Sequence, residues 1–462
     1  MDLVGITSVE SAPKGMLDDL PMSSYQIWSV LMIAATVILD GLDNQMLGLA
    51  APSLIAEWGI DRSALGSVFA LGFVGMAIGT LVSGWIGDRF GRRGALILGV
   101  GVFGAATLLT GFSTSLVQIA LLKALAGVGL GGVPGTASAM IAEFTPARWR
   151  SVAVTFGVVC VSIGGIIGGV AASLILPEFG WRWLFYSGGV ITLAFVAYLC
   201  WRLPESPRYL AERPERGDEL ARMMRRIGHP DPDGLLPTTD SNAPKAVHAP
   251  TIDLVRGPLR RDTLALSLAM FAGMFMIYLM FNWAPTLLFS AGFTLPTASL
   301  GLTSFNIGGT IGAMVAAFAI IRFGSRAPLI AMAVVGAGVC VFLAWLPIAQ
   351  ARNEGFLLVG LGGLGLFASA AQSAMFAVGA HAFPTAMRAR GLGLMGAAGR
   401  VGAIVSAFTG SWLIGMGSPG FFGVLALLML VNAIGFLAIR GHVPRIAREP
   451  FAPGVSQRKT VA

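Results

Sequence analysis

Twelve apolar runs, each long enough to cross a lipid bilayer, constrain this chain more than any other feature. About 20 helical residues span a hydrocarbon core of about 30 Å. Only 12% of the residues are charged, about half the share of a soluble domain, which is too little to cover a soluble particle of this size. The runs predict an all-α membrane protein with twelve transmembrane helices at about 26–50, 65–86, 94–112, 116–142, 151–176, 184–201, 263–289, 298–321, 327–348, 355–382, 390–415 and 420–440.

The basic residues predict the sidedness of these spans. If the N-terminus lies in the cytoplasm, most loop arginines lie inside, and the external loops hold only Arg62, Arg182 and Arg352. This is the positive-inside pattern, so the net charge of +8 indicates topology and not nucleic-acid binding. The expected parts are a cytoplasmic tail at 1–25, a six-helix bundle at 26–201, a partly disordered cytoplasmic linker at 202–262, a second bundle at 263–440 and a cytoplasmic tail at 441–462.

An internal repeat supports the division into two bundles. The loop after the second span reads GWIGDRFGRR from Gly84 to Arg93, and the loop after the eighth span repeats the core Arg322-Phe323-Gly324. Repeated loops at equivalent places are expected of duplicated six-helix halves. The acidic residue of the first copy, Asp88, is replaced by Ile321 in the second.

The GxxxDRxGRR pattern resembles the signature of the major facilitator superfamily, and PESPR at 204–208 resembles a motif of several of its subfamilies. DGLD at 40–43 and the glycine-rich segment around Arg400 resemble the aromatic acid:proton symporters of that superfamily. The resemblance implies a proton-coupled importer of an aromatic, hydroxybenzoate-like carboxylate in a bacterial inner membrane, working as a monomer without a cofactor or metal in aromatic hydrocarbon catabolism. Lys123 stands where these transporters usually carry arginine, which weakens any carboxylate clamp there.

The ionisable residues inside the spans are Asp40, Asp43, Lys123 and Arg400. Such residues are costly in a bilayer and are functional candidates by default. Asp40 and Asp43 are three residues apart on one helix face, where two carboxylates cannot both stay ionised cheaply. One of them is therefore expected to carry the coupled proton, unless an Asp only holds a helix or gate by hydrogen bonding.

Arg400 offers a planar fork that matches a substrate carboxylate, and an Asp of the first span is a candidate partner in the empty state. The alternative is a permanent ion pair that locks two helices. Lys123 either binds substrate or proton, or extends its amine outward to the membrane surface.

Polar and aromatic side chains in the candidate pore helices complete the predicted substrate site. An aromatic acid needs a flat apolar slot, a cation and a few hydrogen-bonding groups. The candidate residues are Asn44, Tyr278, Asn282, Trp283, Asn306 and Gln372. The alternative for each of them is a structural role, in packing or in a contact between helices.

The cytoplasmic loops predict a charge network that is stable in only one conformation and so biases alternating access. The alternative is that these charges only set the topology. Glu143, at the end of the fourth span, is expected to contact a loop arginine. The candidate gating residues are Gly84, Asp88, Arg89, Gly91, Arg92, Arg93, Glu143 and Arg388.

The sequence leaves two other functions open and argues against a third. A proton symporter of another organic anion or a sugar-like metabolite shares the same general motifs. A transporter-like sensor would bind its ligand without moving it. A membrane-embedded enzyme is not expected, because the four histidines lie far apart and no nucleophile motif is present.

Overall fold

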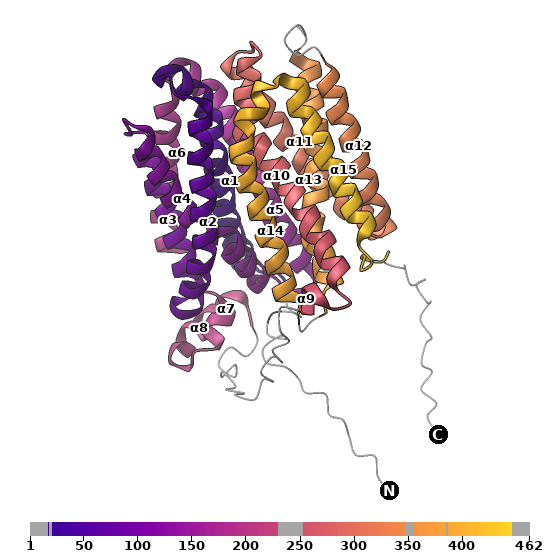
Figure 1. Cartoon of the computed structure of the whole chain (residues 1–462). Helices are drawn as coiled ribbons and strands as arrows, with labels where there is room; N and C mark the ends of the chain where they lie inside the picture. The colour runs from indigo at the N-terminus through magenta and orange to yellow at the C-terminus, as the bar shows by residue number, and fades with distance from the viewer. Residues whose placement is uncertain (1–16, 18–20, 230–252, 347–353, 385–386, 446–462) are drawn as a thin grey trace, which may run out of the picture.

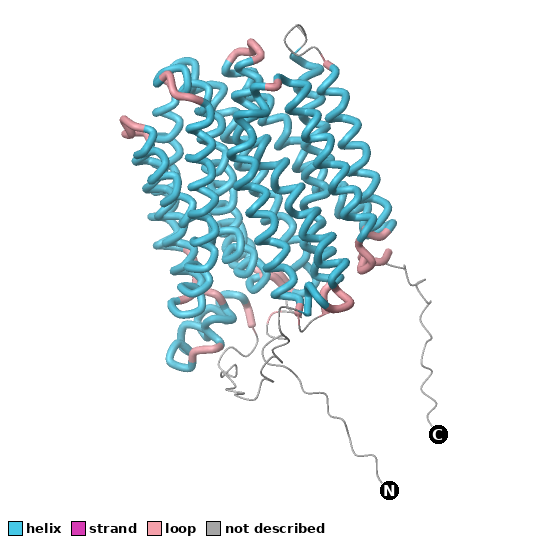
Figure 2. The backbone as a smooth tube through the Cα atoms, in the orientation of Figure 1, coloured by secondary structure: helices cyan, strands magenta, loops and turns pink. Residues whose placement is uncertain are grey.

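The computed structural model describes residues 17, 21–229, 253–346, 354–384 and 387–445. Throughout these ranges the regular structure is helical, and twelve helices are long and apolar enough to cross a membrane. Figures 1 and 2 show them side by side in one bundle. They are α1 (Ser24–Trp58), α2 (Arg62–Phe90), α3 (Arg92–Thr110), α4 (Leu116–Phe144), α5 (Ala147–Phe179), α6 (Trp181–Arg202), α10 (Arg260–Ser290), α11 (Leu295–Phe323), α12 (Arg326–Trp345), α13 (Glu354–Ala382), α14 (Arg388–Gly415) and α15 (Gly417–Ala438).

Short helices gather at one end of this bundle, which we call the linker face (Figure 1). They are α7 (Pro207–Ala211), the 3-10 turn Pro214–Arg216, α8 (Gly217–Ile227) and α9 (Asp253–Arg256). On α8, Leu220 and Met224 are buried against the first half. This start of the expected linker is therefore folded and packed, whereas 230–252 lies outside the described residues.

The two halves repeat the same helix pairings. In the first half α2 packs on α4, α1 on α5 and α3 on α6. In the second half the equivalent pairs are α11 with α13, α10 with α14 and α12 with α15. The RFG loops repeat as well, because Gly91 (φ 102°) and Gly324 (φ 77°) end α2 and α11 in a conformation that side chains disfavour. The predicted two-bundle fold is confirmed.

Glycines let the helices approach closely within each half. A Cβ on Gly75 of α2 would lie 2.1 Å from the Ala124 carbonyl oxygen of α4. A Cβ on Gly365 of α13 would lie 1.9 Å from the Phe305 carbonyl oxygen of α11. Lipid is as apolar as leucine, so close backbone packing of this kind holds membrane helices together.

The halves meet along α1 with α10, α2 with α14 and α5 with α11. Toward the end opposite the linker face this interface is tight, since every residue from Leu279 to Leu288 of α10 is buried. A Cβ on Gly66 of α2 would lie 2.7 Å from the Ala407 carbonyl oxygen of α14. Nearer the linker face, a Cβ on Gly84 or Gly396 would meet nothing within 4 Å. The halves are therefore closely packed at the far end along α1 and α10, whereas a side chain would have room at Gly84 and Gly396 nearer the linker face.

The observed helices overlap all twelve predicted spans but often extend beyond them. The spans predicted to end at about 50 and 176 continue to Trp58 and Phe179. Pro52 and Pro177 lie inside these helices. A proline is tolerated in a membrane helix because its neighbours re-satisfy the backbone groups that it frees.

Candidate functional site

A buried ion pair lies at the centre of the first half. The Lys123 amine of α4 is 3.2 Å from Asp43 Oδ2 of α1 and 3.2 Å from the Asp43 backbone carbonyl oxygen. The Thr107 hydroxyl of α3 donates to Asp43 Oδ1. Lys123 therefore turns into the bundle, and the alternative in which its amine extends to the membrane surface is wrong for this conformation. A Cβ on Gly72 of α2 would lie 3.2 Å from Lys123 Cγ, so this glycine leaves room for the lysine stem.

Asp40 lies one helical turn before Asp43 on α1, in a different environment. Its side chain is buried, and Oδ1 has no hydrogen-bond partner among the described residues. A buried polar atom without a partner is rare in folded proteins and marks a functional candidate. The predicted proximity of the two carboxylates is present, but among the described residues only Asp43 forms an ion pair with Lys123.

Arg400 of α14 reaches across to the first half. Its Nη2 donates to the Thr80 hydroxyl of α2, and it has no acidic partner in the part of the chain that the structure describes. The expected contact with an Asp of the first span and the alternative of a permanent ion pair are both wrong for this conformation. Tyr278 of α10 lies within electrostatic range of Arg400 and Asp40 and interacts with the Asn44 side chain.

A small cavity lies between α1, α2, α4 and α10, beside Lys123. Its polar lining is Asn44, Lys123 and Asn282, and its apolar walls include Phe69 and Phe73. Its free volume is about 10 Å³, close to the minimum for one water molecule. Phe73 also packs edge-on against Tyr278, with ring centroids 4.6 Å apart. The cavity thus combines a cation, amides and aromatic rings in a contracted space.

Five of the predicted substrate residues are not part of this cavity lining: Arg400 and Tyr278, described above, and Asn306, Trp283 and Gln372. Asn306 of α11 exchanges hydrogen bonds with Gln45 of α1 (2.8 and 3.2 Å), so it joins the two halves. Trp283 is buried and packs edge-on against Phe69 at 5.4 Å between centroids. Gln372 of α13 donates to the Met270 sulfur of α10 at 2.9 Å. These contacts match the structural alternative of packing and helix contact.

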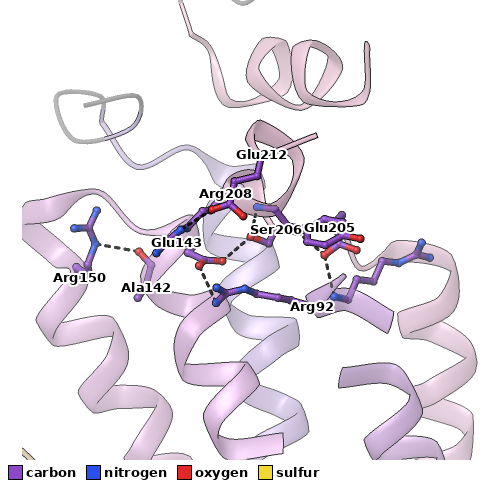
Figure 3. Close-up of polar contacts among 10 residues, drawn as sticks. Arg92, Ala142, Glu143, Arg150, Glu205, Ser206, Arg208 and Glu212 are labelled. Atoms are coloured by element: carbon purple, nitrogen blue, oxygen red, sulfur yellow. Dashed lines mark hydrogen bonds and ion pairs between the residues drawn. The ribbon is translucent and has the colours of Figure 1, made fainter. Parts of the chain in front are cut away.

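The linker face carries an ion-pair cluster within the first half (Figure 3). Arg92 is 2.8 Å from Glu143, which also accepts a 2.5 Å hydrogen bond from the Ser206 hydroxyl. Glu205 accepts from the backbone N–H groups of Arg93 (3.0 Å) and Ser206 (2.9 Å). The expected contact between Glu143 and a loop arginine is therefore present, together with the PESPR segment.

The other predicted gating residues contribute differently. The Asp88 side chain is exposed and has no ion-pair partner among the described residues, while its carbonyl oxygen accepts from Arg213 at 3.4 Å. Arg89 stacks its guanidinium over Trp85 at 5.5 Å. Arg388 begins α14 at the linker face and is exposed. The expected network therefore involves Glu143 and Glu205 and not Asp88.

Some residues of the site were missed by sequence reasoning. Gln45 was detectable, because it is a polar residue within an apolar span two positions after Asp43. Thr80 and Thr107 gave no such signal, since threonines in membrane helices usually bond their own helix backbone. Glu205 lay inside the recognised PESPR segment, but nothing in the sequence placed it against Gly91.

Two related six-helix halves around a charged centre define the fold of a secondary transporter. The chain belongs to the Major Facilitator Superfamily, whose profile matches residues 33–302 and 266–461. It is similar in fold to the xylose transporter XylE from E. coli in its inward open conformation. That match has a TM-score of 0.72 and 19% sequence identity, and covers 91% of this chain and 97% of that one.

Two relatives cover nearly the whole chain. The gallate transporter of Pseudomonas putida is 34% identical over 433 residues, which is 93% of this chain and 95% of the relative. The 4-hydroxybenzoate transporter PcaK of Pseudomonas aeruginosa is 36% identical over 422 residues, which is 91% of this chain and 93% of the relative. Both are transporters and not enzymes, which agrees with the expectation from the sequence.

Proposed function

We propose that this protein imports an aromatic carboxylate together with a proton by alternating access. The observation that carries the proposal is the unbalanced cation Arg400, which has no acidic partner in the described residues and faces the first half. Relatives at 34% and 36% identity are named for gallate and 4-hydroxybenzoate. An aromatic acid is the substrate class that a cation, amides and Phe walls suit.

The charges of the centre couple the proton to the anion. Lys123 and Asp43 cancel, which leaves Arg400 and Asp40. While Asp40 is ionised the centre is neutral overall, and an added carboxylate would be a surplus negative charge at low dielectric. Once Asp40 is protonated the centre carries one positive charge, which a monoanionic carboxylate neutralises. Proton binding therefore favours substrate binding, as symport requires.

The shape of the interface supplies the conformational change. The far end is closely packed between α1 and α10, and the free space beside Gly84 and Gly396 lies nearer the linker face, so we infer that the described conformation opens toward that face. The arginines that predict the cytoplasmic side, among them Arg89, Arg92, Arg148 and Arg322, lie at helix ends on the linker face. By this assignment the described conformation is inward-facing, and the membrane is a bacterial inner membrane. We also propose the domain bounds predicted from the sequence, with bundles at 26–201 and 263–440, and a single chain as the transporting unit.

Uptake by purified protein in liposomes tests the proposal. With an inward proton gradient, labelled 4-hydroxybenzoate should accumulate, and a protonophore should abolish the accumulation. Accumulation that survives collapse of the pH gradient and the membrane potential would exclude proton coupling. Competition by unlabelled neutral amides, aliphatic acids and sugars then defines the substrate class, because a transporter of other metabolites would be inhibited by those compounds instead.

The role of Arg400 needs a matched pair of variants. Arg400→Met should weaken binding of the aromatic acid about 10- to 100-fold, the range for losing a hydrogen-bonded charge partner. Thr80→Val removes only the partner of Arg400 across the interface. If Arg400 clamps the substrate, Thr80→Val still binds it. Equal losses in both variants would mean that Arg400 acts by holding α2 and α14 together.

A further inference from the structure

Asn282 of α10 differs from every other polar residue of the central cavity. The cavity has three polar lining residues. Lys123 is paired with Asp43, and Asn44 interacts with Tyr278. Asn282 is 3% exposed, and its amide nitrogen Nδ2 has no hydrogen-bond partner among the described residues. A residue that lines the cavity therefore carries a buried hydrogen-bond donor without a partner.

The fold holds Asn282 in this position. A Cβ on Gly48 of α1 would lie 2.1 Å from the Phe281 carbonyl oxygen and 2.9 Å from Asn282 Cα, so α1 and α10 touch through their backbones. The neighbours of Asn282 from Leu279 to Leu288 are all buried. The amide is therefore held in a buried position beside the cavity, and a free buried donor is unfavourable until an acceptor arrives.

We propose that Asn282 determines specificity by donating from Nδ2 to an acceptor on the ring of the bound acid, in the simplest case a ring hydroxyl. The inference rests on the proposed function, because it takes the aromatic carboxylate as occupant of the cavity. The carboxylate would bind Arg400, which has no acidic partner among the described residues, while Phe69 and Phe73 of the cavity wall offer faces to the ring. Asn282 then selects ring-hydroxylated acids over unsubstituted benzoate, since an unsubstituted ring leaves the donor unpaired.

The expected preference is substantial. A site built to hydrogen-bond a substrate group discriminates against the analogue without it, because its own buried polar group is left unpaired. For one neutral donor we expect hydroxybenzoate to bind about tenfold more tightly than benzoate. A donor also distinguishes between substituents of similar size, because a phenol oxygen accepts a hydrogen bond better than an aniline nitrogen.

The test measures binding of benzoate, the three monohydroxybenzoates and 4-aminobenzoate to the purified protein by calorimetry. The variant is Asn282→Leu, which keeps the branched shape of the side chain and removes the amide. The matched control is Thr286→Val, one turn further along α10, where a buried hydroxyl also lacks a partner but does not line the cavity. In Asn282→Leu the preference for the best hydroxybenzoate over benzoate should fall to about onefold, and in Thr286→Val it should stay at about tenfold.

The outcomes separate this inference from the proposed function. If the wild-type protein binds none of these acids, the proposed function itself is wrong. If the acids bind and Asn282→Leu keeps the wild-type preference, only the role of Asn282 is overturned. Should the variant fail to fold, the wild-type protein still decides, because 4-aminobenzoate binding as tightly as 4-hydroxybenzoate would contradict a donating amide.

Discussion

Removing one partner of the Asp43–Lys123 pair should destabilise the first half far more than removing both. The nitrogen and oxygen are 3.2 Å apart, and the side chains are only 13% and 4% exposed. At an effective dielectric constant near 20, Coulomb's law gives an attraction of about 5 kcal/mol at this distance. Loss of either partner strands a buried charge, so Lys123→Met and Asp43→Asn should each cost about 3–5 kcal/mol of unfolding free energy.

The assay is a double-mutant cycle. Unfolding of wild type, both single variants and the double variant is followed by tryptophan fluorescence in mixed micelles with increasing SDS. The double variant buries no charge at this position, so it should lose only about 1–2 kcal/mol, mainly from the Thr107 hydrogen bond and altered packing. The resulting coupling energy is about 4 kcal/mol or more.

A coupling energy below about 1 kcal/mol would refute this reasoning, because that is the range for solvent-exposed pairs. It would mean that water reaches Asp43 or Lys123 and screens them in the membrane-embedded protein. Lys123→Arg provides the complementary control. It keeps the positive charge, so its loss of stability should be smaller than that of Lys123→Met, although the larger guanidinium must fit the space beside Gly72.

Three further predictions concern the gate regions. Gly48→Val should abolish uptake and shift the protein away from the state closely packed at the far end, because its Cβ would meet the Phe281 carbonyl oxygen at 2.1 Å; spin-label distances across that end would show it. Glu143→Gln should lower the unfolding free energy by about 1–3 kcal/mol, since it removes the partly buried ion pair with Arg92. Burial lowers the pKa of His442 in the folded protein below the ordinary histidine pKa of about 6.5. The neutral ring therefore stabilises its segment at pH values above about 6.5, and this stabilisation is lost as the pH falls through the lower pKa of the folded state. Hydrogen exchange of residues 439–445, corrected for intrinsic rates, should therefore speed up toward pH 5.

Each of these predictions has a matched control. Gly423→Val in α15 adds the same side chain where a Cβ meets nothing within 4 Å, so it should transport normally. Glu212→Gln removes an ion pair that is 65% exposed on both sides and should change stability by less than about 1 kcal/mol. His442→Gln should make exchange in its segment independent of pH. Equal effects in a variant and its control would contradict the contact assigned to that residue.

The spans and the two halves were predictable, because the cost of burying polar backbone in lipid restricts each apolar run to a helix. The ends of the spans were less so, since Pro52 and Pro177 look like breakers in the sequence but lie inside helices. The charges of the centre were also predictable, as intramembrane ionisable residues are rare. Their partners were not. Lys123 and Asp43 lie 80 positions apart, and a single sequence carries no record of which helices touch.

The two loops that end in RFG show how the repeat became asymmetric. In the first half the loop glycine Gly91 lies against Glu205, within the ion-pair cluster of the linker face. In the second half Gly324 lies against the backbone of Val443, and the adjacent Ser325 binds Val443 and His442. The first loop is therefore stabilised by the carboxylate of Glu205, and the second by backbone, hydroxyl and imidazole groups.

The two halves also differ in the charged and polar residues that they supply to the centre of the membrane. The first half supplies the acids Asp40 and Asp43, and the second half supplies Arg400 and the free amide of Asn282. A proton and an anion bound by the same half would stay a fixed distance apart through the transport cycle. Bound by different halves, they change their separation whenever the halves rock, and the energy of each then depends on the other and on the conformation. Under the proposed function, coupling therefore follows from which half carries each charge, and it requires no direct contact between the proton site and the substrate.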